Sequence, residues 1–314
     1  MINGLAGNIQ NNQLNFKTEA MGVVCCANEE ADMIEKDAPT TQEQGAGGKA
    51  AAKQPAPAIK KEQLKDLPEV NWQRISNLYE RFEQSLPFNR INVGTMFDKI
   101  DEAEKAALEN AGGVLPDGVD PYVTLMSLRQ ALPTAAWRDL MDPVSALSKT
   151  LLSQQFKGEG HNADQIDVNT LKMFSLLHCA SKKPIEKAKA LYCILQDGGF
   201  EKHEQISATD KDFEPVFLKL CKLVTTDIFE LANLNGGVSI IYSESECKDL
   251  CGKQNIEELR EDDWLEAVYG AQSRLTNDQW LEKVTDKKGK ASWIFNPKEL
   301  RNKLFAQAGI DQRH

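Results

Sequence analysis

The chain has 314 residues, of which 41% are hydrophobic and 7% aromatic, enough for one large globular unit or two small ones. Its net charge of −10 argues against nucleic-acid binding, which usually requires a basic surface. No apolar run approaches the roughly 18–20 residues that cross a bilayer, and no hydrophobic N-terminal segment indicates secretion. We therefore expect a cytoplasmic protein with reduced cysteines.

Residues 1–65 contain one aromatic side chain, Phe16, and a Gly, Ala and Pro-rich stretch at 45–58. Such a segment buries too little apolar surface to offset its chain entropy, so we predict a disordered tail. Within it, the letters MGVVCC at 21–26 resemble an N-myristoylation site followed by palmitoylated cysteines. The resemblance makes Gly22, Cys25 and Cys26 candidate lipidation sites if translation begins at Met21 rather than Met1. A chance Met-Gly pair beside two cysteines is the alternative.

From residue 66 onward, the sequence predicts helices almost throughout. Apolar residues recur at steps of three and four over 72–82, and again over 213–231, where they predict one long amphipathic helix. Helix starts are indicated at Asp120, Asp142 and Asn296, each followed by Pro, and at Thr276 and Ser207. Strand signals are short, around Ile166, Ile206, 238–242 and 293–295. We predict an all-α fold with minimal β-bridges.

Four segments share a pattern in which an apolar helix ends, a polar Gly/Asn/Asp-rich stretch contains a single β-branched residue, and another apolar helix begins. They start near Glu159, Gln196, Asn233 and Asp286, at separations of 37, 37 and 53 residues. The pattern resembles the EF-hand family, in its neuronal calcium sensor and calcineurin B-like arrangement. The resemblance implies a helical extension over 66–144, a first pair of helix–loop–helix units over 145–235, and a second over 236–314. An unrelated helical bundle is the alternative.

Calcium requires six to eight oxygen ligands, including a bidentate Glu at loop position twelve and Gly at position six. The first loop has His161 and Ala163 at ligand positions, and the fourth has Lys288 and Lys290, whose charges repel a cation. The second loop is too long for the pattern. The third comes closest, although Val238 replaces the glycine. Its candidate ligands for weakly bound calcium are Asn233, Asn235, Ser239, Glu244 and Glu246.

No sequence motif for an enzyme is present, and His178 beside Cys179 is interpreted as a packed helix residue. We therefore expect a non-enzymatic adaptor or scaffold that binds an amphipathic helix of a protein partner in a groove, with calcium binding weak or lost. A calcium sensor that uses the third loop, anchored by acyl chains to a membrane, is one alternative. A structural component of a cytoskeletal or ciliary assembly is another.

Overall fold

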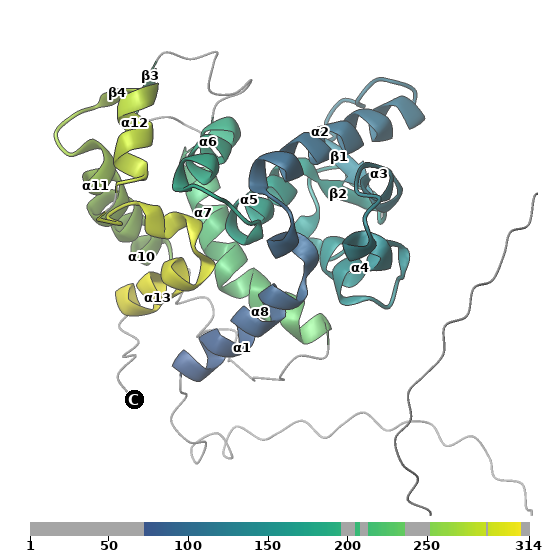
Figure 1. Cartoon of the computed structure of the whole chain (residues 1–314), viewed down its shortest axis with the longest axis horizontal. Helices are drawn as coiled ribbons and strands as arrows, with labels where there is room; N and C mark the ends of the chain where they lie inside the picture. Colours follow the sequence, from purple (N-terminus) through teal and green to yellow (C-terminus); the bar gives the residue numbers. More distant parts are fainter. Residues whose placement is uncertain (1–71, 196–204, 208–212, 236–251, 287, 309–314) are drawn as a thin grey trace, which may run out of the picture. The chain divides into compact units, whose positions relative to one another are not determined.

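The structure is a computed structural model that describes residues 72–195, 205–207, 213–235, 252–286 and 288–308 (Figure 1). Contacts between Cα atoms divide the chain into residues 1–61 and 62–314, and all described residues belong to the second unit. The predicted tail, with its candidate lipidation sites Gly22, Cys25 and Cys26, lies outside the described residues. Those sites therefore stay predictions.

The predicted helical class is confirmed, because helices account for 68% of the described residues and the strands are few and short. Up to residue 178, the elements are α1 (Trp72–Ser85), η2 (Pro87–Arg90), α2 (Val93–Asn110), β1 (Tyr122–Thr124), α3 (Leu125–Ala131), η3 (Ala135–Met141), α4 (Ala146–Leu151), η4 (Gln154–Phe156), β2 (Gln165–Asp167) and α5 (Val168–His178).

The remaining described elements continue this alternation of helices and three-residue strands. They are α6 (Pro184–Leu195), β3 (Gln205–Ser207), α7 (Phe213–Val224), α8 (Thr226–Leu234), α10 (Lys253–Glu258), the π-helix η5 (Leu259–Leu265), α11 (Glu266–Tyr269), β4 (Arg274–Thr276), α12 (Asn277–Val284), η6 (Ser292–Phe295) and α13 (Pro297–Gln307).

The strands form two separate antiparallel pairs, each linking two inter-helix segments. In the first pair, Val123 of β1 lies opposite Ile166 of β2. In the second, Ile206 of β3 lies opposite Leu275 of β4. The strand signals at Ile166 and Ile206 are thus confirmed, but the predicted pairing of the segments near Glu159 and Gln196 is wrong. The predicted pairing of the segments near Asn233 and Asp286 stays a prediction, because residues 236–251 lie outside the described residues. The segment after Glu159 faces one from the predicted extension 66–144, and the segment after Gln196 faces residues 274–276 rather than the segment after Glu159.

The long helix predicted over 213–231 is interrupted at Thr225, which separates α7 from α8 with φ −124° and ψ −94°. The Thr225 hydroxyl donates to the Cys221 carbonyl oxygen at 2.7 Å. The Val224 carbonyl oxygen accepts a hydrogen bond from Arg301 Nε of α13 at 2.6 Å. A tertiary contact thus occupies a backbone acceptor that a continuous helix would have used internally.

Two of the predicted helix starts are confirmed. Thr276 forms a capping box with Gln279 at the start of α12, and the Asn296 side chain accepts from the backbone of Lys298 and Glu299 at the start of α13. The starts at Asp120 and Asp142 are wrong, because Thr124 caps α3 and Ser145 caps α4. A strand over 293–295 is also wrong, since η6 is a 3₁₀ helix. Residues 208–212 and 238–242 lie outside the described residues.

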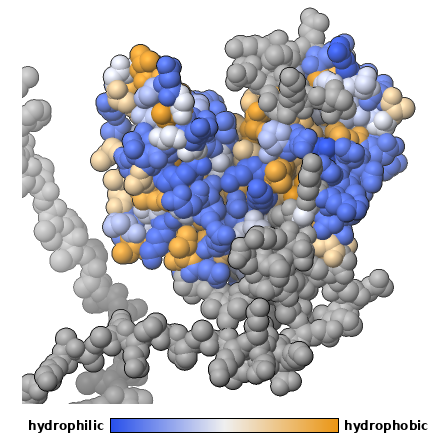
Figure 2. Space-filling view, turned by 180° about the vertical axis from the view of Figure 1, so that it is seen from behind, coloured by the Kyte–Doolittle hydropathy of each residue, from blue (hydrophilic) through white to orange (hydrophobic). Residues whose placement is uncertain are grey.

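One continuous hydrophobic core runs through the described helices, and Trp137, Trp264 and Trp280 are among its largest fully buried side chains. On the face drawn in Figure 2, polar residues cover most of the described surface, with apolar residues in small groups between them. No described helix is both long enough and apolar enough to cross a membrane.

Candidate helix-binding surface

Helix α1 lies across α8 and α13 and buries one face of its surface there (Figure 1). Ser76, Tyr79 and Glu83 are buried, and their spacing of three and four residues puts them on the same side of the helix. Arg81 and Gln84, on other sides, are exposed. The helix predicted from the periodicity over 72–82 is therefore confirmed, and it is amphipathic. We call the surface of α7, α8 and α13 that receives it the α1 seat.

The centre of the α1 seat is Arg301 of α13, whose side chain is fully buried. Its Nη1 donates to the backbone oxygen and the hydroxyl of Ser76, both at 3.3 Å. Its Nη2 forms an ion pair with Glu83. Together with the bond from Nε to the Val224 carbonyl, these contacts use each nitrogen of the guanidinium group, as a buried cation requires.

Glu83 is the counter-charge of Arg301 and is almost fully buried itself. Burial raises the pKa of Glu83 from 4.5 to about 7, whereas the charge and the hydrogen bond of Arg301 act in the opposite direction. The pair is thus held in a site where each charge depends on the other. A helix that lacked an acidic residue at this position would leave the guanidinium group without its counter-charge.

Aromatic and rim contacts complete the seat. The ring of Tyr79 stacks on Phe229 of α8, with centroids 4.4 Å apart and planes 24° apart, and Arg301 lies 5.9 Å from the centre of the Tyr79 ring. At the partly exposed edge, Lys298 Nζ contacts Glu80 at 2.9 Å. The surface therefore recognises a helix by a small residue, an aromatic residue and an acid at positions i, i+3 and i+7.

Arg301 was missed in the sequence because arginines on amphipathic helices usually face solvent. The only available signal was the apolar periodicity of 72–82, which identifies α1 as amphipathic without indicating what it packs against.

The predicted ligand positions of the first loop are engaged in contacts between the two loops of the first strand pair. His161 Nδ1 accepts from the Gly158 amide at 2.9 Å, and Nε2 lies 2.9 Å from the Asp120 carbonyl oxygen. The Asp120 carboxylate accepts from the Glu159 amide at 2.7 Å. The Asp167 carboxylate caps α5 through the Thr170 amide at 2.6 Å. These side chains therefore stabilise the loop by hydrogen bonds within the protein.

The candidate calcium ligands of the third loop are only partly described. Asn233 is exposed near the end of α8. The Asn235 amide group donates to the Leu231 carbonyl at 2.8 Å and to the Thr150 hydroxyl at 3.4 Å, which holds it against α8 and α4. Ser239, Glu244 and Glu246 lie outside the described residues, so calcium binding at this loop stays a prediction.

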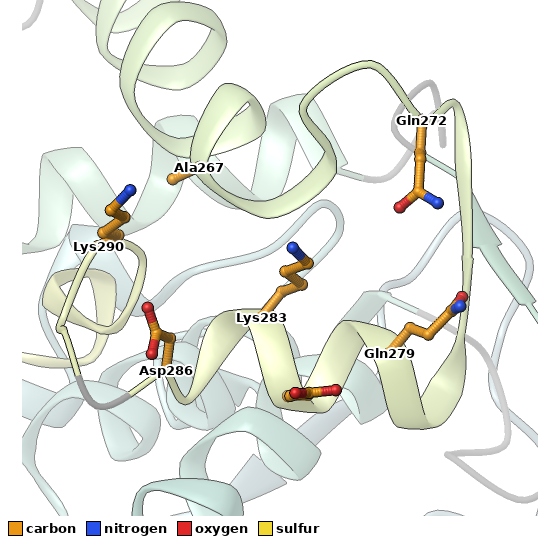
Figure 3. A pocket seen from close by; sticks show the side chains of 7 residues that line it. Ala267, Gln272, Gln279, Lys283, Asp286 and Lys290 are labelled. Carbon is orange, nitrogen blue, oxygen red and sulfur yellow. The ribbon is translucent and has the colours of Figure 1, made fainter.

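The predicted fourth loop borders a polar cavity of about 550 Å³ between α11 and α12. Figure 3 shows Lys283 and Lys290 pointing into this space, with Asp286 nearby. Asp286 accepts from the Lys288 amide at 3.3 Å, so its carboxylate forms a local turn. Of the charged residues that line it, Glu282, Lys283 and Lys290 are exposed and Asp286 is half-buried. None of the lining residues is a buried polar group that would specify a ligand.

The pair of His178 and Cys179 lies at the end of α5, where burial lowers the pKa of His178 and raises the pKa of the Cys179 thiol to about 12. A raised pKa disfavours the thiolate that a nucleophile needs. Nearby, Lys187 donates to the carbonyl oxygens of Leu177 and Phe295 at 2.9 and 3.0 Å, and burial lowers its pKa to about 8. The three side chains thus have the properties of packed core residues.

No family model, curated protein or solved structure matches the chain. Among the described residues, no three His, Cys, Asp or Glu side chains are grouped so that they could hold a metal ion. The resemblance to the EF-hand family therefore stays a prediction, and the α1 seat is the site on which a function can best be argued.

Proposed function

We propose that this chain is a non-enzymatic adaptor with an EF-hand-like body that binds an amphipathic partner helix in the α1 seat without requiring calcium. The observation that carries the proposal is α1 itself. It contributes a small residue, an aromatic residue and an acid to a surface built from α7, α8 and α13. A helix that binds in a groove usually contributes anchor side chains at positions i, i+3, i+4 and i+7.

The EF-hand-like architecture is supported by the two strand pairs. Each pair joins two segments of the form helix, polar loop, three-residue strand and helix, with one apolar residue opposite another. If these paired residues mark loop position eight, position twelve falls on Ser127, Thr170, Asp210 and Gln279. Only one of the four is acidic, whereas calcium loops place a bidentate Glu there. This count supports a body whose helices are held without the ion.

The partner helix would have to compete with α1. A tethered segment acts at an effective concentration in the millimolar range, so a free helix of equal intrinsic affinity binds weakly. The partner therefore either carries stronger anchors at the same three positions or binds when α1 is released. The chemistry of the seat specifies these anchors as a small residue near Arg301, an aromatic ring on Phe229, and a carboxylate on the guanidinium group.

The test uses a fluorescent peptide of residues 70–86 and the full-length chain. In wild type, α1 should block the seat. In a Tyr79→Ala variant, the α1 of the chain loses its aromatic anchor, so the peptide should bind at least about tenfold more tightly than to wild type. Arg81→Ala, which changes an exposed residue of the same helix, is the matched control and should bind as wild type does. Fluorescence anisotropy measures each affinity.

The same titration with calcium or with a chelator separates the alternatives. Equal affinity in both conditions supports the adaptor, whereas tighter binding with calcium favours the sensor. A folded Tyr79→Ala chain that binds the peptide no better than wild type would contradict the proposal. Calcium sensing by the third loop, acyl anchoring and membership of a cytoskeletal assembly stay predictions.

A further inference from the structure

The loop between α4 and α5 closes around the ammonium group of Lys157. Lys157 Nζ donates to the carbonyl oxygens of Asn162 at 3.3 Å, Ala163 at 2.8 Å and Gln165 at 2.5 Å. An ammonium group has three N–H donors and no acceptor, so these three contacts use its full hydrogen-bonding capacity. The lysine side chain is half-buried, and its charge therefore lies inside the loop rather than in bulk solvent.

The rest of the loop is built to hold these carbonyl oxygens in place. The Gln165 side chain accepts from the Asn162 amide at 2.7 Å, and His161 joins Gly158 to the neighbouring loop. At Gly158, an added Cβ would lie 2.8 Å from both His161 and Asp120, so a larger residue does not fit there without movement. The cage of acceptors around Lys157 is therefore specified by several independent contacts.

One carboxylate near the cage favours a cation. Burial lowers the pKa of Lys157, and the negative charge of Asp164 raises it by a smaller amount. Asp164, Glu159 and Asp120 are exposed. None of them is needed to complete the contacts of the ammonium group, which are made to backbone oxygens alone.

We propose that the carbonyl oxygens of Asn162, Ala163 and Gln165 form a cation site whose resident occupant is the ammonium group of Lys157. The ammonium group, which is attached covalently to the chain, thus takes the position that a bound cation would occupy. Primary alkylammonium ions are the class of ligand that fits the site when the Lys157 side chain is removed. This inference does not depend on the adaptor function, because the loop lies outside the α1 seat.

Chemical rescue tests the site in the full-length chain. Lys157→Ala should lower the transition temperature of unfolding, and about 50 mM propylammonium chloride should restore about a third of the loss or more by binding the folded state. Tetramethylammonium chloride at the same concentration has no N–H donor and should not restore it. Lys149→Ala, which removes an exposed lysine of α4, is the matched control and should respond equally to both salts.

Rescue by calcium chloride that is confined to Lys157→Ala would support the same site with a metal ion as the substitute. If propylammonium shifts Lys157→Ala no more than Lys149→Ala, the proposal is overturned.

A measurement on the wild-type chain applies even if Lys157→Ala does not fold. In ¹⁵N-resolved NMR of lysine ammonium groups, the Lys157 signal should exchange slowly with water and persist after a chelator is added. Lys187, whose ammonium donates to two carbonyl oxygens, provides an internal reference, and Lys157→Arg assigns the signal. Loss of the Lys157 signal by fast exchange, or its disappearance on chelation, would contradict an ammonium group that resides in the cage.

Discussion

The α1 seat and the α4–α5 loop are each organised by one internal cation, but the groups that contact the cation differ. Arg301 is fully buried and is matched by a carboxylate, Glu83, besides two backbone carbonyl oxygens and a hydroxyl. Lys157 is only half-buried, and the acceptors of its hydrogen bonds are all backbone oxygens. The difference follows from solvation, because a charge that keeps some water needs only dipoles, whereas one without water needs a counter-charge.

Removing the cation of the α1 seat should produce the largest effect. At pH 8, above the Glu83 pKa of about 7, Arg301→Leu leaves an ionised Glu83 buried without its partner, which typically destabilises a protein by about 3–5 kcal/mol. For a folded unit of this size, the transition temperature should fall by about 10 °C. Calorimetry measures the change. Arg138→Leu, at an exposed arginine, should change stability by less than about 0.5 kcal/mol.

A second substitution distinguishes a lost charge pair from lost packing. The double variant Arg301→Leu with Glu83→Leu should be more stable than Arg301→Leu alone, because no unpaired carboxylate remains. If the losses from the two single variants are additive, the charges of Arg301 and Glu83 are not coupled. Arg301 would then not differ from Lys157 in needing a counter-charge.

The pH dependence of stability sharpens the comparison, because Glu83 in the α1 seat is a buried carboxylate with a raised pKa, whereas the acceptors around Lys157 are backbone oxygens. Since the pKa of Glu83 is raised from 4.5 to about 7, its contribution to stability is fully present below pH 4.5 and is lost as the pH rises through 7. The upper limit of this loss is ~3 kcal/mol. Glu83→Gln should abolish it, whereas Glu109→Gln, at an exposed position of α2, should keep it. Urea unfolding at a series of pH values measures the difference.

The smallest effect is expected where the two loops of the first strand pair meet. Asp120→Ala removes the acceptor of the Glu159 amide and should cost about 1 kcal/mol. Amide hydrogen exchange should become faster at Val123 and Ile166 and remain unchanged at Ile206 and Leu275 of the other pair. Asp117→Ala, at an exposed residue of the same loop, is the control. Equal acceleration in both pairs would contradict a local role for Asp120.

The features that were predicted correctly depend on residues close together in the sequence. The capping box of Thr276 and Gln279, the cap at Asn296, and the short strands at Ile166 and Ile206 each follow from a local pattern. The strand at Tyr122–Thr124 also had a local signal, since it is rich in aromatic and β-branched residues. We misjudged it because Asp120 and Pro121 together favour a helix start.

The features that were missed depend on contacts between distant residues. The end of α7 at Val224 is stabilised by Arg301, which lies 77 residues further along the chain. Ser76 and Glu83 are buried only because Arg301 is there to receive them. The cage around Lys157 was missed for another reason. Its acceptors are backbone oxygens, which every residue has, so no letter in the sequence marks them.

The contact between Ser76 and Arg301 spans 225 residues and joins the first described helix to the last. Ribosomes add roughly 5–20 residues per second, so α13 emerges on the order of 10–45 s after α1. Phe229 of α8, which stacks on Tyr79, is made before α13, so the native surface for the buried side of α1 is completed in two steps. Until α13 is made, Ser76 and Glu83 have no Arg301 to bind, and α1 can reach its full set of native contacts only after that helix is complete.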